Sequence, residues 1–353
     1  MLKKLSKQKI SDIITYGIVL VAFIVMQILI NAGQISSLFE GLMVPLCTYI
    51  ILAISLNLVV GVLGELSLGH AGFMCVGAFT SAFFSKCMQD TITNSIVRFL
   101  IALLIGIVVA AIFGLLIGIP VLRLNGDYLA IVTLAFGEII KNIVNVLFIG
   151  KDSKGFHFST KDVMALNMEP DGKVIVNGPQ GITGAPKDAT FFIGFILVLL
   201  TLFIVLNLIH SRDGRAIMAI RDNRIAAESI GINITKYKLM TFTISAAMAG
   251  AAGVLYGHNL SNLTANTNNF GYNMSINILV FVVLGGIGNI RGSIISAVVL
   301  TLLPELLRGL SDYRMLIYAI VLIVMMLFNW APKAIEWREK YLSFKKNKKE
   351  AVK

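Results

Sequence analysis

The side chains best suited to chemistry in this sequence are ionisable groups that lie within or beside long apolar runs. A charged group inside a membrane is costly, so such residues mark pathways for protons, ions or solutes by default. The five are Glu65, His70, Asp127, Glu138 and Glu305. Each also has a structural explanation. Glu138 lies three residues before Lys141 and can pair with it on a helix, and Asp127 follows Gly126 at a helix start, where a carboxylate suits the dipole.

The sequence contains no motif for binding or hydrolysing a nucleotide. No Ser or Thr follows the Gly-Lys pairs at 150–151 and 172–173, as a phosphate-binding loop requires. There is no nucleophile elbow and no zinc-binding helix. The cysteines Cys47, Cys75 and Cys87 lack metal-ligand spacing and predict neither a disulfide nor a metal site. We therefore expect no enzyme and no cofactor in this chain. If ATP and Mg²⁺ power it, partner subunits bind them.

Composition predicts an all-α polytopic membrane protein. Of 353 residues, 57% are hydrophobic and only 14% are charged, whereas a soluble domain is about a quarter charged. Several apolar runs approach or exceed the ~18–20 residues that span a bilayer as helix. The net charge is +11, but Lys and Arg gather at the two termini and in one loop. This distribution indicates membrane orientation, and binding to nucleic acid is the weaker interpretation.

The apolar runs predict about ten transmembrane helices. They are Ile13–Ile30, Leu38–Val60, Leu66–Phe84, Ile96–Leu122, Tyr128–Phe148, Phe191–Ile209, Leu239–His258, Ile276–Gly288, Ser293–Leu307 and Met315–Trp330. An even number of crossings places both termini on one side. The positive-inside rule makes that side the cytoplasm. The basic N-terminus precedes a run without a cleavage site, so we expect a retained first helix.

These expectations divide the chain into three parts. Residues 1–12 form a basic cytoplasmic N-terminus, residues 13–330 the transmembrane domain and residues 331–353 a basic cytoplasmic tail. Within the domain, residues 150–189 form an external loop, with a short strand at Val174–Val176, and residues 211–238 form a cytoplasmic loop. The external loop suits docking of a soluble partner, or closure over the helix ends.

The cytoplasmic loop Ser211–Lys238 is the most charged internal stretch and predicts a helix along the membrane surface. Asp213 can cap that helix, and Gly231 can end it in a left-handed conformation. One stripe of the helix carries small and apolar residues that allow a second protein to approach closely: Ala216, Ile220, Ala227 and Ile230. An ordinary basic inside loop is the alternative.

Two apolar regions are interrupted by glycines at corresponding places in the two halves of the chain. The glycines, interpreted as a gate or hinge, are Gly61, Gly64 and Gly69 in the first half and Gly285, Gly286 and Gly288 in the second. Such pairs indicate a repeated architecture with a transport pathway at its interface. Close helix packing through small residues is the alternative explanation.

Several separated motifs, taken together, resemble the permease subunits of branched-chain amino acid ABC importers, in particular those of the M type. The resemblance covers Leu56 to about Trp330. In chain order the motifs are residues 57–73 (NLVVGVLGELSLGHAGF), 126–140 (GDYLAIVTLAFGEII), 178–184 (GPQGITG), 214–216 (GRA) with 226–232 (AAESIGI), 238–242 (KLMTF) with 255–257 (LYG), and 283–288 (VLGGIG) with Gly292. Their shared order and spacing carry the similarity.

The resemblance implies that the charged loop couples the chain to an ATPase. The residues implied in this contact are Gly214, Arg215, Ala216, Arg221, Asn223, Ala226, Ala227, Glu228 and Gly231. Ile225 stands where the related loops carry glutamate, so a salt bridge through that position is not expected. The implied partners are a second, homologous permease, two ATPases, an extracytoplasmic binding protein and membrane lipid.

The resemblance also implies translocation of a small amino acid without covalent change. The residues that would line or support the passage are Ser67, His70, Thr133, Glu138 and Asn289. Three other functions stay open at this point: an ABC permease for a sugar, nucleoside or short amide; an ion-coupled secondary transporter using the intramembrane acids; and a scaffold or receptor. The glycine breaks argue against the last.

Overall fold

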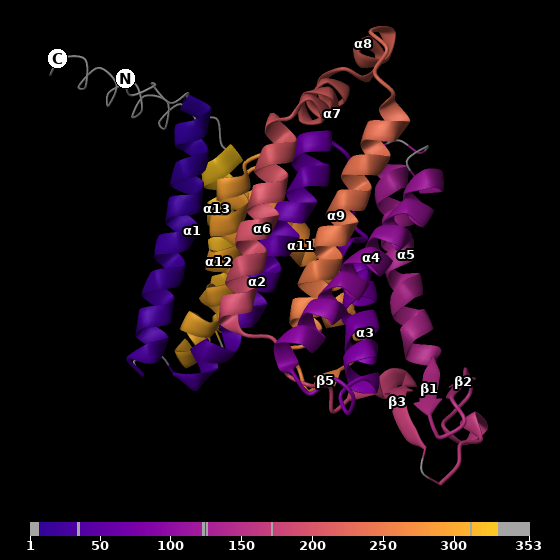
Figure 1. The fold of residues 1–353 in the computed structure, drawn as a ribbon. Helices are drawn as coiled ribbons and strands as arrows, with labels where there is room; N and C mark the ends of the chain where they lie inside the picture. The colour runs from indigo at the N-terminus through magenta and orange to yellow at the C-terminus, as the bar shows by residue number, and fades with distance from the viewer. Residues whose placement is uncertain are drawn as a thin grey trace, which may run out of the picture.

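The computed structural model describes residues 7–33, 36–121, 124, 126–170, 172–310 and 313–330. The predictions for residues 1–6 and for the basic tail 331–353 lie outside these ranges. The described chain is a bundle of helices with a small sheet at one end, called here the sheet end, and a pair of short helices at the other, called the loop end (Figure 1). The N-terminal end of α1 (Lys7–Asn31) and the C-terminal end of α13 (Arg314–Trp330) both lie at the loop end.

The long helices follow the predicted apolar ranges closely. They are α1 (Lys7–Asn31), α2 (Ser37–Asn57) continued by the π-helix η1 (Leu58–Leu63), α3 (His70–Cys87), α4 (Ser95–Val121), α5 (Asp127–Val146), α6 (Phe191–His210), α9 (Ile234–Gly257), α11 (Tyr272–Gly285), α12 (Ile290–Leu306) and α13 (Arg314–Trp330). Among the described residues, seven helical spans are long and apolar enough to cross a membrane. These seven do not include α3, α11 or α13, so a count of ten crossings stays a prediction. A polytopic all-α protein is confirmed.

Small residues bring α3, α4 and α9 together at the centre of the bundle. A Cβ built on Gly77 of α3 would lie 2.6 Å from the Cα of Gly250 in α9, and one on Gly253 would lie 3.0 Å from the nitrogen of Ala78. Such close backbone approach is how membrane helices gain packing contacts without a hydrophobic driving force between them. Phe73 and Phe242 fill the adjoining space edge to face. The core therefore lies around α2, α3 and α9.

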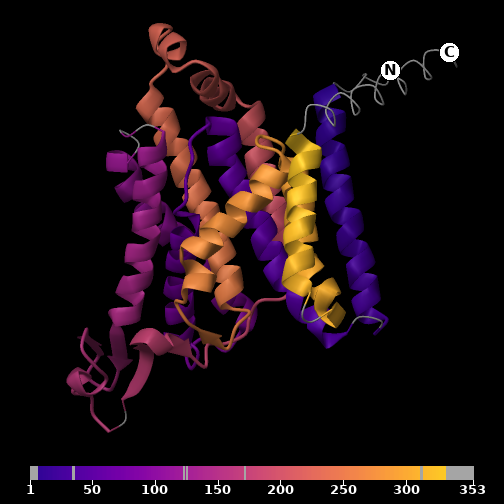
Figure 2. The same ribbon diagram turned by 180° about the vertical axis from the view of Figure 1, so that it is seen from behind.

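The outer faces of the peripheral helices are apolar. In α4 the exposed side chains include Leu100, Leu104, Val108 and Leu116, and α1 likewise exposes Ile, Leu and Val. Exposed apolar surface of this extent is expected where lipid replaces water. Figure 2 shows the back of the bundle, where α11 and α12 lie beside α13.

The sheet end is built from the segment between α5 and α6. Strands β1 (Phe148–Lys151), β2 (Phe156–Ser159) and β3 (Lys173–Asn177) form an antiparallel sheet in the order β2-β1-β3. The short strand predicted at Val174–Val176 is therefore confirmed. β4 (Ile182–Thr183) pairs with β5 (Asn262–Leu263), and short 3-10 turns lie at Met164–Leu166 (η2), Gly178–Gln180 (η3) and Leu307–Leu310 (η4). The pairing of β4 with β5 ties this segment to the end of α9.

The loop end carries α7 (Arg212–Asp222) and α8 (Arg224–Ser229), which project beyond the bundle (Figure 1). The sequence predicted one helix here, and the structure has two. Asn223 is extended between them, and its side chain accepts a hydrogen bond from the N–H of Ala226, so it caps α8. The predicted cap at Asp213 is wrong: Ser211 caps α7 by accepting from the N–H of Gly214. Asp213 lies in the first turn instead.

Candidate functional site

The two glycine breaks, far apart in sequence, lie against each other. A Cβ built on Gly61 would lie 2.6 Å from the Cα of Gly288, so Gly61 has no room for a side chain toward the second break. Asn57 joins the two regions. Its Oδ1 accepts from the N–H of Gly288 at 2.9 Å, and its Nδ2 donates to the Oγ of Ser293 at 2.9 Å. Because Asn57 is fully buried, these bonds satisfy a polar group that would otherwise be costly.

The backbone at both breaks needs glycine for a conformational reason as well. Gly64 has a φ of +82°, and Gly286 and Gly288 have φ of +93° and +81°, a region that side chains with a Cβ rarely adopt. Gly64 ends η1 after its π-helical turn. Asn289 then caps α12 by accepting from the N–H of Gly292 at 3.3 Å. Each break is therefore an ordered turn at a helix end.

The charged loop reaches the first break directly through Arg221 of α7. Its Nη1 donates to the carbonyl of Gly61 at 3.0 Å. Its aliphatic chain covers Gly64, where a Cβ would lie 2.6 Å from the Cγ of Arg221. The same guanidinium donates to Asp222. Arg221 thereby joins α7 to the backbone of η1, which contacts Gly288 through Gly61.

A buried ion pair fixes the segment that follows the first break. Lys238 of α9 pairs with Glu65, and their side chains are 3% and 14% exposed. Two residues after Glu65, the hydroxyl of Ser67 is buried and has no hydrogen-bond partner in the described structure. The N–H of Leu68 then donates to the Oγ1 of Thr133 in α5 at 3.0 Å. Glu65 is thus held by a cation within the chain, which accounts for one of the intramembrane acids.

The remaining residues predicted for the passage divide into buried and accessible ones. His70 contacts the Oγ of Ser55 at 2.7 Å and is 2% exposed, and Thr133 is fully buried. In this chain both hold helices together. Glu138 pairs with Lys141 and also accepts from the N–H of Tyr272 at 2.8 Å. The predicted pairing of Glu138 and Lys141 is therefore present.

Asn289 is exposed, and the two acids not yet described take structural roles. Asp127 is the first residue of α5. Glu305 pairs with Arg308 at 2.9 Å. Of the residues predicted for the passage, Glu138 and Asn289 reach the surface of this chain, whereas Ser67, His70 and Thr133 are buried.

The predicted stripe of the charged loop does not form a single outward face. Ala227 and Ile220 are buried together with Ile234 in a small apolar cluster, whereas Ile230 is 75% exposed. The interruption at Asn223 explains the difference, because it resets the helical phase between α7 and α8. Ala227 therefore packs inward and holds α8 onto the chain, so its side chain is not exposed on the loop.

The other residues assigned to this loop mostly shape its turns or lie at its surface. The N–H of Gly214 bonds to Ser211 in the tight turn after α6, and Gly231 closes α8 with a φ of +85°. The exposed ones are Arg215, Asn223, Ala226 and Glu228, with Ala216 half-buried. Ile225 is 81% exposed. With Ile230 it gives the tip an apolar character.

Sequence reasoning missed the residues that join the elements of this site. Asn57, Ser293 and Lys238 were not singled out, although Asn57 opens the first glycine-rich motif and Lys238 opens another. A buried lysine and a buried asparagine at helix ends are the signal that was available, since such groups need partners. Their partners lie far away in sequence, and only the fold supplies them.

These features define a class: a multi-pass membrane transport protein whose broken helices are tied to a projecting charged loop. The chain belongs to the family described as branched-chain amino acid transport system / permease component, whose model matches residues 37–328. This is a family of transport permeases and not of enzymes.

Curated relatives agree with this assignment. The high-affinity branched-chain amino acid transport system permease protein LivM of Salmonella typhimurium is 35% identical over 296 residues, which cover 81% of this chain and 67% of the relative. The corresponding LivH protein of the same organism is 25% identical and covers 79% of this chain and 89% of the relative. The fructose import permease protein FruG of Bifidobacterium longum is 25% identical, covering 94% of each. No solved structure matches this chain.

Proposed function

We propose that this chain is a permease subunit of an ATP-binding cassette importer for leucine, isoleucine and valine. An extracytoplasmic binding protein delivers the amino acid, and a second homologous permease completes the passage. Two separate ATPases power the pair, one of them through α7 and α8 of this chain. The amino acid crosses without covalent change. ATP and Mg²⁺ bind to the ATPases, and this chain needs no cofactor.

The observation that carries the proposal is the contact between Arg221 and Gly61. It connects a loop that projects from the bundle to the one place where two helix breaks touch. Coupling requires a connecting element that has two conformations, so that a bound partner can shift the equilibrium between them. In this mechanism the ATPase binds the tip of α8, and α7 moves with α8. The movement of α7 then shifts η1 against Gly288, which opens or closes the passage.

The gripping surface is apolar at its centre and charged at its rim. Ile225 and Ile230 are the most exposed apolar side chains of the tip, and Glu228 lies beside them, exposed. Central apolar anchors surrounded by polar groups are the usual composition of a protein interface. The absent glutamate at Ile225 is thereby replaced by hydrophobic contact.

The test is leucine uptake by the complete complex in proteoliposomes, with ATP supplied on the ATPase side. Ile225→Asp should lower ATP-driven uptake about tenfold or more, because loss of a central interface anchor costs about 2 kcal/mol. Thr235→Asp adds the same charge at an exposed position at the start of α9 and should leave uptake unchanged. Equal uptake in the two variants would contradict the proposed grip. Uptake that survives ATP depletion and collapses with an ion gradient would identify a secondary transporter.

A sugar is the second candidate solute, because the relative named as a fructose import permease covers nearly the whole chain. The same vesicles decide between the two. Unlabelled leucine, isoleucine and valine should each compete with labelled leucine, and fructose should not. Fructose uptake without leucine uptake would replace the amino acid assignment while leaving the importer mechanism in place.

A further inference from the structure

An asparagine-rich surface on α10 (Thr267–Phe270) and α11 has no counterpart in the predicted sites. Asn268 and Asn277 are exposed, and Asn273 is half-buried. With Ile276 they line a hollow of about 280 Å³. Asn273 donates to the Oδ1 of Asn268 at 3.1 Å, and the Asn277 side chain has no hydrogen bond to another described residue.

This surface lies inside the apolar thickness of the bundle. Glu138 is eight residues from the end of α5 at Val146, which places it about 12 Å inside the helix end at 1.5 Å per residue. The carboxylate of Glu138 accepts from the N–H of Tyr272, the first residue of α11. Lys141 likewise donates to Thr267 of α10 at 3.2 Å. The chain therefore turns back into the bundle before α11 begins, and Asn277 lies deeper still.

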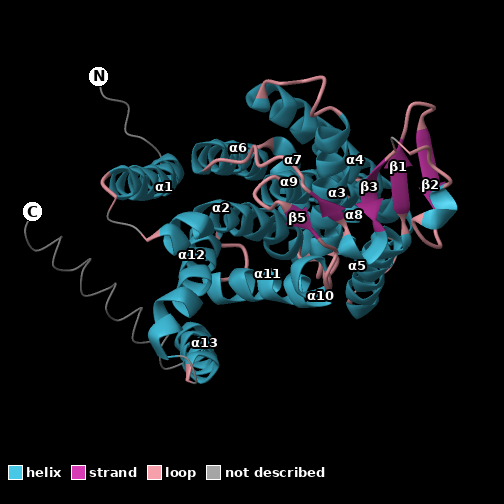
Figure 3. Cartoon of the chain, turned by 90° about the horizontal axis from the view of Figure 1, so that it is seen from below, coloured by secondary structure: helices cyan, strands magenta, loops and turns pink. Residues whose placement is uncertain are grey.

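Asparagines at this depth are incompatible with a lipid-facing surface. The exposed faces of α4 carry Leu104, Val108 and Ile112, as hydrocarbon requires. An amide that loses its hydrogen bonds in hydrocarbon is strongly disfavoured. The face of α5, α10 and α11 must therefore meet water or protein. Figure 3 shows these three elements together along one side of the molecule, with α2 and α3 behind them.

The surface is polar but holds no uncompensated charge among its described residues. Glu138, which contacts the start of α11, is paired with Lys141. The polar groups that line the hollow itself are neutral amides that both donate and accept. A surface of neutral amides can hydrogen-bond a solute that has no net charge, and it does not bind an isolated ion tightly. An α-amino acid zwitterion meets this description.

We propose that Asn268, Asn273 and Asn277 form one wall of an aqueous solute passage, closed on its far side by the second permease subunit. The hollow is a transient site for a zwitterionic amino acid. This inference rests on the proposed function for its solute. The wall itself is independent of that choice, because it follows from amides at membrane depth.

Access of water to Asn277 is the direct test. Asn277→Cys and Leu104→Cys are made in a Cys87→Ser background, because Cys47 and Cys75 are buried. Both are assembled into the complete complex in proteoliposomes and exposed to a positively charged, water-soluble methanethiosulfonate. Leu104 is 64% exposed on α4 and serves as the lipid-facing control. The Asn277→Cys thiol should react at least about tenfold faster, since lipid-facing thiols do not ionise.

Three labelling outcomes bear differently on the passage and on the solute. Equally slow labelling at both positions would overturn the passage and indicate a dry interface. Fast labelling that leucine slows, in the presence of the binding protein, supports both passage and solute. Fast labelling slowed by fructose but not by leucine supports the passage and overturns the amino acid assignment. Asn277→Leu should lower uptake about tenfold in complexes that still assemble with the ATPases.

Discussion

Because Gly61 has no side chain, the two helix breaks, which lie far apart in the sequence, can pack against each other. It is fully enclosed, its carbonyl receives Arg221, and its Cα faces Gly288. Any Cβ here would push apart the two breaks and weaken the hydrogen bond from Gly288 to Asn57. Glycine at this position is explained by contact alone, since its φ is not among the positive ones.

Gly61→Ala should therefore destabilise the protein and impair uptake. Overpacking a dense site typically costs about 1–3 kcal/mol. Here the added methyl would collide with the Oδ1 of the buried Asn57 and with the backbone of Gly288, which are hydrogen-bonded to each other. The measurement is the thermal transition of the purified complex in detergent, together with leucine uptake. Gly17→Ala on α1, where nothing lies within 4 Å of the added methyl, is the matched control and should retain both. Identical behaviour of the two variants would show that the breaks are not in contact.

The roles of individual polar residues were only partly predictable. The residue types were chosen correctly as buried or membrane-depth polar groups, and the pairing of Glu138 with Lys141 followed from their spacing. Whether a side chain faces a passage or a neighbouring helix depends on the packing of distant segments. His70 therefore meets Ser55, and Glu65 meets Lys238. The asparagines of α10 and α11 escaped notice because they are uncharged.

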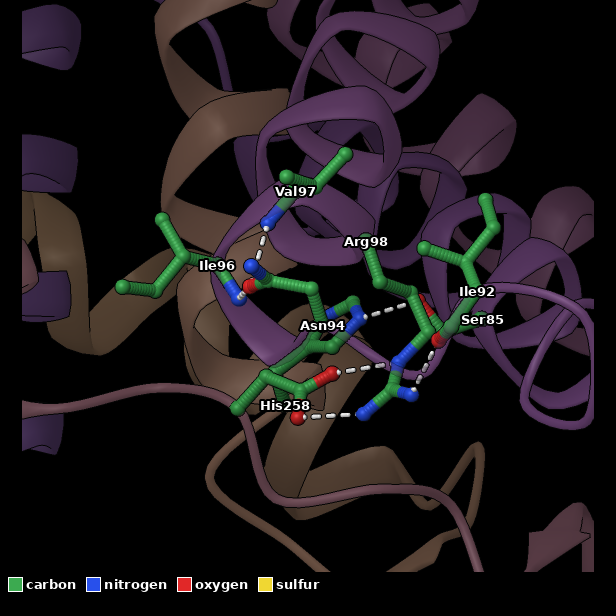
Figure 4. Close-up of polar contacts among 8 residues, drawn as sticks. Ser85, Ile92, Asn94, Ile96, Val97, Arg98 and His258 are labelled. Atoms are coloured by element: carbon green, nitrogen blue, oxygen red, sulfur yellow. Dashed lines mark hydrogen bonds and ion pairs between the residues drawn. The ribbon is translucent and has the colours of Figure 1, made fainter.

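Among the elements, α4 is held to the segment before α6 by a buried ion pair at the sheet end. Arg98 donates from Nε and Nη2 to both carboxylate oxygens of Asp188, at 2.8 and 2.6 Å. Its Nη1 donates to the carbonyl of Ile92 at 2.9 Å, and His258 contacts Ser85 close by (Figure 4). Side-chain exposures of 7% and 4% leave the pair no water to replace a lost partner.

Breaking this pair from one side should cost more than replacing it entirely. Asp188→Asn leaves Arg98 buried without its counter-charge, which typically costs about 3–5 kcal/mol. The double variant Arg98→Met with Asp188→Leu removes both charges and should be less destabilised than the single one. Thermal unfolding of the two variants and the parent measures the coupling. A single variant as stable as the parent would mean that water reaches the pair.

The division of the charged loop into α7 and α8 could not be derived from its pattern. Many polar residues are as unfavourable in a helix interior as Asn223 is, so its residue type alone does not predict a break. Its preference for capping separates α7 from α8 here because α8 then packs onto the chain through Ala227. The predicted ending of the loop helix at Gly231 is confirmed by its left-handed backbone. The turn residues could therefore be predicted from the sequence, whereas the direction in which each helix face points could not.

For the molecule as a whole, hydrophobic length was the most informative signal. Each of the ten predicted apolar ranges falls on a helix, because burying a helical backbone in lipid demands a long apolar run. The least regular case is α11, with 14 residues. It is short because the chain before it turns back into the bundle to meet Glu138 and Lys141, a tertiary arrangement that no local pattern encodes.

The last prediction concerns which way the molecule faces. The basic residues of the loop end favour the cytoplasm, and an ATPase can grip α8 only from there. Thr235→Cys places a thiol on an exposed residue of the loop end outside the proposed ATPase contact, and Met164→Cys places one on the sheet end, where Met164 is 88% exposed. In the Cys87→Ser background, a membrane-impermeant maleimide applied to cells with an accessible outer face should label Met164→Cys at once. Thr235→Cys should react only after permeabilisation. Labelling of Thr235→Cys in intact cells would put the loop out of reach of any ATP-driven partner, and the importer mechanism would fail with it.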